Sequence, residues 1–223
     1  MEKTVNLVSG GIDSYLAYKL IEGIPVFVNY GQKYADKEFA ACNNLYGDKL
    51  NVIKLNNNNT NCLEIDNNYI PNRNLTLISL VVNYYYPDRI IMAGMKDDNC
   101  LDKSETAFRY FREIISKYSK KDIHIYSPFW YTTKGKAIEN YLNKGYDPEI
   151  LKQTISCYSS SINKCGDCEA CFRWVVALES NGVSTDLKLS NRIIKKYMND
   201  IDNYGTDRRN RIVEYFKRNN YEL

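Results

Sequence analysis

The chain lacks the marks of a secreted or membrane-embedded protein. Its longest apolar runs, such as residues 75–82, fall far short of the roughly 20 residues that cross a bilayer. The first residues show no signal-peptide pattern and lead into a strand-like segment. Dense basic tracts are also missing and the net charge is only +3, so no nucleic-acid backbone site stands out. We therefore expect a cytoplasmic protein without a membrane partner.

Histidine is scarce, whereas cysteine is not. The only histidine, His124, lies in a strand-like segment, where we expect it to pack rather than to catalyse. Four of the seven cysteines crowd into residues 157–171, while Cys42, Cys62 and Cys100 are scattered. In a chain of 223 residues without a signal peptide, this crowding favours a metal site over disulfides.

Strand-like apolar segments alternate with helix-like amphipathic segments in the first half of the chain. Strands are predicted over residues 5–8, 24–30, 50–55, 89–93 and 122–126. Helices are predicted between them, over residues 14–22, 33–45, 75–85 and 104–119. This alternation is typical of an α/β fold, a parallel twisted sheet with helices on both faces. The strand ends at Ser9, Tyr30 and Gly94 should then meet at one edge, where such sheets bind ligands.

A glycine-containing turn, Ser9-Gly10-Gly11-Ile12-Asp13-Ser14, joins the first predicted strand to the first predicted helix. The glycines let the backbone approach a ligand, and the helix N-terminus offers amides and a positive dipole end to phosphate oxygens. Ser9 and Ser14 add hydroxyl donors, while Asp13 suits Mg²⁺ or a donor that it orients. The alternative is a tight strand–helix turn in which Asp13 only caps the helix.

The cysteine cluster has the spacing of a metal site. Cys157, Cys165, Cys168 and Cys171 are separated by seven, two and two residues. Two-residue spacings let neighbouring sulfurs converge on one ion, and Gly166 permits the tight turn that this requires. Four thiolates leave no open coordination position, so we expect a structural Zn²⁺. An iron–sulfur cluster and four reduced thiols are the alternatives.

The two motifs divide the chain. Residues 1–126 are predicted to form an α/β nucleotide-binding domain that contains the glycine turn. Residues 127–223 are predicted to form a helical C-terminal part that carries the cysteines. The polar run 56–59 is expected to be a solvated loop.

The glycine turn resembles the pyrophosphate loop of the PP-loop ATP pyrophosphatase superfamily, Ser-Gly-Gly-x-Asp-Ser. Together with the cysteine cluster, in this order, it resembles the 7-cyano-7-deazaguanine (preQ0) synthase family. Further family-like segments are Asn29-Tyr30-Gly31-Gln32-Lys33, Ile70-Pro71-Asn72-Arg73-Asn74, Pro128 with Lys134, and Ser156-Cys157-Tyr158 with Cys171-x-Arg173. The resemblance extends from about Val5 to Gly182.

This resemblance implies an enzyme that uses ATP, Mg²⁺ and ammonia to convert 7-carboxy-7-deazaguanine to the nitrile, through an adenylate and an amide. The catalytic residues that it implies are Asp13, Arg73 and Lys134, with Lys136 as a substitute for Lys134. The nucleotide-binding residues that it implies are Val8, Ser9, Gly10, Gly11, Asp13, Ser14, Val28, Asn29 and Tyr30. The substrate-binding residues that we expect are Gln32, Arg73, Gly94, Asp98, Asp102 and Ser104.

Residues 98–106 depart from the family, which usually carries Asp-x-Ser-Gly-Tyr-Pro-Asp-Cys-Arg there, near the deazaguanine base. Asp98 or Asp102, together with Ser104, could take its place because a carboxylate suits the donor edge of guanine. Tyr34 also replaces the family's usual histidine.

Three functions stay open on the sequence alone. The first is the nitrile synthase. The second is a divergent member that stops at the amide, or that couples the activated acid to another amine on a protein or nucleic acid. The third is a non-catalytic, zinc-stabilised nucleotide-binding module, which the intact glycine turn argues against. A homodimer stays open as well.

Overall fold

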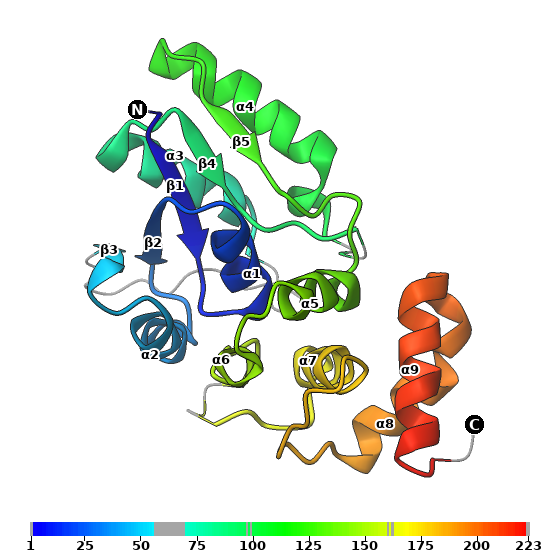
Figure 1. Ribbon diagram of the computed structural model, residues 1–223. Coiled ribbons are helices and arrows are strands. Elements are labelled where there is room, and N and C mark those ends of the chain that lie inside the picture. The colour runs from blue at the N-terminus through cyan, green and yellow to red at the C-terminus, as the bar shows by residue number, and fades with distance from the viewer. Residues whose placement is uncertain are drawn as a thin grey trace.

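Five parallel strands form one sheet at the centre of the structure (Figure 1). The computed structural model describes residues 2–55, 70–96, 98, 100–159, 161 and 163–221. The strands are β1 (Thr4–Val8), β2 (Ile24–Asn29), β3 (Asn51–Lys54), β4 (Arg89–Ile91) and β5 (His124–Tyr126). Their order is β3-β2-β1-β4-β5, and every neighbouring pair is parallel. The predicted α/β fold is therefore confirmed.

Helices cover both faces of this sheet. Along the chain they are α1 (Ile12–Leu20), α2 (Ala35–Tyr46), α3 (Arg73–Tyr85) and α4 (Glu105–Ser119). Residues of α1 and α2 share one apolar cluster with Phe27 of β2, whereas residues of α3 and α4 share a second cluster with Val26 and Val28. Neighbouring residues of β2 thus enter opposite layers, which explains why residues 24–28 of this strand are all apolar.

A group of helices follows β5 and packs below the sheet in the view of Figure 1. They are α5 (Lys134–Asn143), α6 (Pro148–Lys152), α7 (Glu169–Glu179), α8 (Asn191–Asn199) and α9 (Thr206–Arg218). Three short 3₁₀ turns complete the description: Gly47–Lys49, Leu101–Lys103 and Ile201–Asn203. None of the described helices is long and apolar enough to cross a membrane.

The helix α7 is the most deeply buried of the C-terminal helices. Eight of its eleven residues are buried, and Phe172 and Val175 share a cluster with Ile12 of α1 and Phe216 of α9. One apolar cluster therefore joins the sheet's helices to the C-terminal helices. The division after residue 126 stays a prediction.

The expectation that His124 packs in the interior is wrong, and the alternative in which Asp13 only caps the first helix is excluded. The His124 side chain is 50% exposed and lies 3.5 Å from Asp122, because it stands on a three-residue edge strand whose middle residue alone is buried. Asp13 does not cap α1, since the helix begins at Ile12 and Gly11 occupies the N-cap position. The polar run 56–59 and Cys62 lie outside the described residues.

Candidate active site and metal centre

The glycine turn lies at the carboxyl edge of the sheet, where the strand order reverses between β1 and β4. Gly10 has a φ of 69°, and a Cβ at this position would lie 2.7 Å from the Cβ of Ala41. The Ser9 amide donates to Ser14 Oγ over 3.3 Å, and Ser14 Oγ donates to the Gly11 carbonyl over 2.9 Å. These bonds fix the turn with Ser9 at the surface and leave the α1 N-terminus without a side-chain cap. Its free amides are suited to an anion.

Lys134 reaches this turn from the C-terminal helices. Its Nζ lies 3.0 Å from Asp13 Oδ1, and the two side chains are only 17% and 19% exposed. Lys134 is the first residue of α5, directly after the N-cap residue Thr133. Lys136 is exposed and pairs with Glu139 over 2.6 Å. Of the two predicted lysines, the structure therefore brings Lys134 to the turn.

Gln32 organises the backbone that follows β2. Its Oε1 accepts a hydrogen bond from the Tyr30 amide over 3.1 Å, and its Nε2 donates to the Val28 carbonyl over 3.4 Å and to Glu38 over 2.9 Å. Three of these residues are buried, namely Gln32, Val28 and Tyr30. The Asn29 side chain accepts a hydrogen bond from the Gly31 amide. The Gln32 amide is thus engaged within the protein, and its predicted substrate contact stays a prediction.

Glu38 is a carboxyl group near this edge that the sequence analysis missed. Burial raises the pKa of Glu38 to about 7, although the hydrogen bond from Gln32 and the charges of Arg73 and Lys37 act to lower it. Glu38 belongs to α2, whose backbone packs against Gly10. The Glu38 carboxyl group can therefore change its charge near neutral pH, on a helix whose backbone contacts the glycine turn.

Arg73 and Asp102 lie together at the start of α3. The Asn74 amide donates to Asp102 Oδ2 over 3.4 Å, and the Asn74 side chain donates to the Asp102 carbonyl over 3.0 Å. Although burial acts to lower it, the pKa of Arg73 is raised, in part by the charge of Asp102. The Cys100 thiol donates to Asp102 Oδ1 over 3.0 Å. The structure thus holds a buried carboxylate beside one of the predicted catalytic cations.

Asp98 sits in a shielded ion pair with Lys103. Its Oδ2 lies 2.8 Å from Lys103 Nζ and accepts from the Met95 amide over 3.0 Å, with the two side chains 19% and 22% exposed. Burial acts to raise the pKa of Asp98, but the charges of Lys103 and Lys134 lower it to about 2. Asp98 is therefore ionised and already carries a cationic partner.

Ser104 and Gly94 have local structural tasks. Ser104 caps α4, because its Oγ accepts from the Ala107 amide over 3.1 Å. A Cβ on Gly94 would lie 2.3 Å from the Trp130 ring, and the Gly94 amide donates to Ser127 Oγ over 2.9 Å. The predicted substrate contacts of Asp98, Asp102, Ser104 and Gly94 therefore stay predictions.

The four clustered cysteines converge on one point. Their sulfurs all lie within 4.8 Å of one another, and the Cys165–Cys171 sulfurs are 3.9 Å apart. Tetrahedral zinc–thiolate bonds place sulfurs roughly 3.8 Å apart. In a four-iron cluster each cysteine binds a different iron, so its sulfurs lie farther apart than around a single ion. The cluster fits zinc.

Backbone amides and proton sharing prepare these sulfurs for a cation. The amides of Cys165 and Ser159 point at Cys157 Sγ, and the amide of Cys171 at Cys168 Sγ, each over 3.4 Å. A hydrogen bond from the Cys171 thiol lowers the pKa of Cys168 to about 4.

The cysteine cluster is attached directly to the glycine turn. The Ile155 amide donates to the Gly10 carbonyl over 2.8 Å, and a Cβ on Gly11 would lie 3.4 Å from Ser156 Oγ. Lys37 of α2 donates to the carbonyl of Ser161 over 2.8 Å. The segment before Cys157 thus forms one wall of the turn.

Comparison with known proteins agrees with this arrangement. The family model described as "Queuosine biosynthesis protein QueC" matches residues 40–182. The chain belongs to this family. It is similar to 7-cyano-7-deazaguanine synthase 1 of Desulfitobacterium hafniense (strain Y51), at 29% identity, with 79% of this chain and 91% of the relative covered. It is also similar to the 7-cyano-7-deazaguanine synthase of Marinomonas sp. (strain MWYL1), at 27% identity, with 84% and 98% covered. This QueC-family member is therefore a ligase-type enzyme.

Two cations of this QueC-family chain were not predicted as site residues, although Arg173 belongs to one of the family-like segments. Lys103, on the short turn before α4, forms the pair with Asp98. Arg173 of α7 donates to the Tyr158 hydroxyl over 3.0 Å. For Lys103 the sequence carries no signal, because the pair depends on how the 98–104 segment folds. For Arg173 the two-residue interval after Cys171 was a usable signal.

Proposed function

We propose that the chain is a 7-cyano-7-deazaguanine synthase, which converts 7-carboxy-7-deazaguanine and ammonia to the nitrile with ATP. The observation that carries this proposal is the 3.0 Å contact between Lys134 and Asp13 of the glycine turn. It joins a cation of the C-terminal helices to a turn built for phosphate, beside a crevice of the sheet. The names of the relatives support the same activity.

The proposed reaction begins by activating a poor electrophile. A carboxylate oxygen of the substrate attacks the α-phosphorus of ATP, the bond from that phosphorus to the bridging oxygen breaks, and pyrophosphate leaves with the electron pair. Ammonia then attacks the carbonyl carbon, AMP leaves, and the added nitrogen loses a proton to give the amide. The amide oxygen then attacks the α-phosphorus of a second ATP and a second pyrophosphate leaves, and loss of AMP and of the two remaining N–H protons gives the nitrile.

We assign the phosphate-binding task to the glycine turn. We propose that the Ser9 hydroxyl and the backbone amides around Gly10 and Gly11 donate to phosphate oxygens. The Ser14 hydroxyl, which donates to the Gly11 carbonyl, would have to turn to join them. Val8, Val28, Asn29 and Tyr30, at the ends of β1 and β2, are proposed to lie beneath the adenosine. The burial of Val8, Val28 and Tyr30 supports a packing role for these three residues.

Magnesium fits Asp13. Oxygen Oδ1 of Asp13 is buried and lacks a hydrogen-bond donor of good geometry among the described residues, although Lys134 lies 3.0 Å away. A carboxylate oxygen of this kind is a ligand that Mg²⁺ prefers. When bound, the ion neutralises charge on the phosphates. Asp13 would hold it, while Lys134 and Arg73 would neutralise the remaining phosphate or carboxylate charge.

Zinc is proposed to act structurally through Cys157, Cys165, Cys168 and Cys171. Four thiolates close its coordination shell, so it supplies stability rather than an open position for substrate. The bond from Ile155 to Gly10 gives this stability a direct effect on the glycine turn.

A second candidate is a synthase that stops at the amide or passes the activated acid to a different amine. The observation that favours it is the engagement of Asp98 with Lys103 and of Ser104 with the α4 cap, in the segment that departs from the family. A base contact would have to compete with these bonds.

Mass spectrometry of one reaction separates the candidates. The purified chain is incubated with ATP, Mg²⁺, ammonium and 7-carboxy-7-deazaguanine, and products are followed with time. We expect the nitrile, with two AMP released per product. Accumulated amide with one AMP would favour the second candidate, and absence of AMP would reject both enzymatic readings. A matched reaction without ammonium should stop after the first adenylation.

A further inference from the structure

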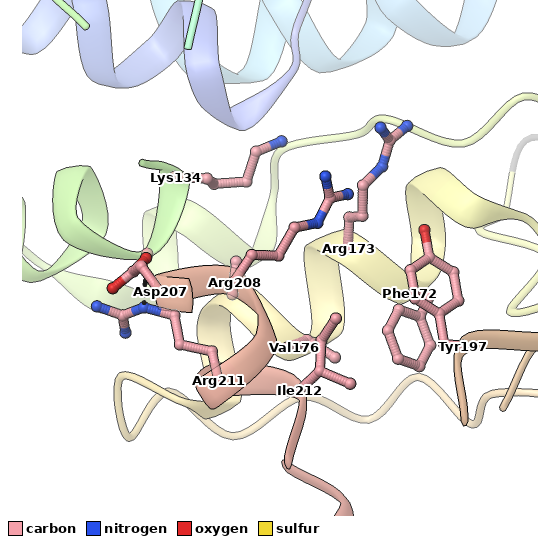
Figure 2. A pocket seen from close by; sticks show the side chains of 11 residues that line it. Lys134, Phe172, Arg173, Val176, Tyr197, Asp207, Arg208, Arg211 and Ile212 are labelled. Atoms are coloured by element: carbon pink, nitrogen blue, oxygen red, sulfur yellow. Dashed lines mark hydrogen bonds and ion pairs between the residues drawn. The ribbon is translucent and has the colours of Figure 1, made fainter. Parts of the chain in front are cut away.

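Three cations from three different C-terminal helices meet at one small cavity. Lys134 of α5, Arg173 of α7 and Arg208 of α9 line it. Figure 2 shows these side chains extending to the same side, toward the pale blue N-terminal part of the chain, while Phe172 and Ile212 lie on the opposite side. The contact of Lys134 with Asp13 establishes that this side adjoins the glycine turn.

The cavity lining carries an excess of positive charge. It contains the cations Lys134, Arg173, Arg208 and Arg211, but a single carboxylate, Asp207. Arg211 lies 3.3 Å from Asp207, whose other contact is the hydroxyl of Thr133 at 2.6 Å. The Asp207 carboxylate is thus engaged with Arg211 and Thr133.

The guanidinium groups of Arg173 and Arg208 each lie beside a tyrosine. Arg173 donates to the Tyr158 hydroxyl over 3.0 Å, and the Arg208 guanidinium lies 4.8 Å from the centre of the Tyr204 ring. The charges of both arginines also act on Glu169, and the charge of Asp98 acts on Arg173, but neither carboxylate lines the cavity. An anion placed between these arginines would form charge-assisted hydrogen bonds without displacing a carboxylate from the cavity lining.

The arginine positions are fixed by packing. Arg173 follows Cys171 by two residues, and its partner Tyr158 follows Cys157 directly, so both ends of the cysteine cluster hold it. Phe172 stacks on Tyr197, with ring centres 3.7 Å apart. The cavity itself measures only about 40 Å³. An anion would therefore lie at its mouth, between the cations and the glycine turn.

We propose that Arg173 and Arg208, together with Lys134, form the second half of a pyrophosphate site and hold the pyrophosphate that leaves during adenylation. This inference rests on the proposed function and adds residues to it. When the bond between the α-phosphorus and the bridging oxygen breaks, the electron pair stays on pyrophosphate. Two planar guanidinium groups donate to the resulting charge across from the amides of the turn.

Direct binding of inorganic pyrophosphate tests the proposal. Calorimetric titration of the full chain with pyrophosphate and Mg²⁺ is compared between the wild type, Arg208→Gln and Arg173→Gln. Arg209→Gln is the matched control, because Arg209 is the next residue of α9 and pairs at the surface with Asp202 over 2.8 Å. We expect at least tenfold weaker pyrophosphate binding for the two variants, with AMP affinity within twofold of the wild type. Arg209→Gln should bind like the wild type.

Folding and the source of failure are controlled in the same experiment. Zinc content and melting temperature are measured for each variant, and Arg208→Gln, which is remote from the cysteines in sequence, decides the result if Arg173→Gln does not fold. Pyrophosphate affinity of Arg208→Gln equal to that of Arg209→Gln would overturn the inference and leave the proposed function standing. A wild type that binds no pyrophosphate would overturn both.

Discussion

The backbone amide of Ile155 donates a 2.8 Å hydrogen bond to the carbonyl oxygen of Gly10. Ile155 precedes the first cysteine of the metal centre by two residues, and Gly10 belongs to the glycine turn. Two motifs separated by about 150 residues of sequence are therefore adjacent in space. We therefore expect a substitution in either motif to alter the structure of the other.

The first prediction concerns the metal. The purified protein should carry about one zinc per chain, and Cys168→Ala should lose it and unfold more easily, by about 3 kcal/mol or more, because three thiols cannot complete the site. Elemental analysis and denaturant unfolding measure both effects. Cys100→Ala, which removes a partly exposed thiol outside the cluster, should keep its zinc. Metal-free protein with wild-type stability would refute the structural role.

The second prediction compares two glycines with the same backbone conformation. Gly166 and Gly145 have φ values of 67° and 76°, but a Cβ on Gly166 would lie 2.2 Å from the Lys188 carbonyl, whereas Gly145 has open space. Gly145→Ala should cost about 1 kcal/mol of stability, from backbone strain alone. Gly166→Ala should cost about 3 kcal/mol or more and weaken zinc retention, because it adds a clash beside Cys165. Equal losses in urea unfolding would contradict this account.

The third prediction concerns the two lysines of α5. Lys134→Met should lower the rate of ATP cleavage to AMP by about 100-fold or more, since it removes a cation from the proposed phosphate site. Lys136→Met should stay within about twofold, because its partner Glu139 lies at the surface. Steady-state release of AMP measures both. Similar losses for the two variants would show that the Lys134–Asp13 contact has no special part.

The fourth prediction is that Asp13→Asn abolishes ATP turnover while leaving the fold intact. The amide is the same size as the carboxylate but cannot hold Mg²⁺ as well. Asp36→Asn, an exposed position at the start of α2, is the matched control and should turn over ATP normally. Unchanged AMP release by Asp13→Asn would reject the assignment of the turn.

The fifth prediction concerns pH and Glu38. Its pKa is raised by burial to about 7 in the folded state, so the folded protein binds more protons than the unfolded chain between about pH 4.5 and pH 7. The stability that Glu38 contributes is therefore fully present below its pKa in the unfolded chain, about 4.5, and is lost as the pH rises through about 7. The loss in unfolding free energy is at most about 3 kcal/mol.

Substitution of Glu38 tests this loss. Glu38→Gln keeps an acceptor for Gln32 and should raise the unfolding free energy at pH 8 more than at pH 4.5. Urea unfolding at the two pH values measures the difference. The exposed Glu113→Gln should show no such pH dependence. An equal effect of Glu38→Gln at both pH values would contradict it.

The fold was predictable because its signals are local. Alternating apolar strands and helices, with Gly23 and Pro25 ending the first helix, suffice for a parallel sheet, and strand ends shifted by at most two or three residues. The metal centre was equally accessible, since its ligand spacing lies within one short segment. The choice of Lys134 over Lys136 needed the structure, because both begin the same helix.

The remaining site residues depend on contacts that the sequence does not encode locally. Asp98 pairs with Lys103 only because the short turn before α4 folds back, and Glu38 acquires its pKa from burial between α2 and the turn. The packing of His124 was predicted wrongly because the sequence shows that residue 124 lies in a strand but not that this strand lies at the edge of the sheet. The positions of such polar side chains depend on tertiary packing, and the apolar periodicity of the sequence carries no information about it.

The burial of α7 sets a limit on how this enzyme can diverge. Cys171 and Arg173 stand about 200° apart around the helix axis, so one faces the metal and the other faces the opposite side. One residue inserted directly after Cys171 would rotate Arg173 by about 100° around the helix axis and away from its cavity. The Phe172 ring would then take the place of the Arg173 side chain. A related chain with a different 98–106 segment should therefore keep the Cys-x-Arg spacing, because Arg173 reaches its cavity only at this interval.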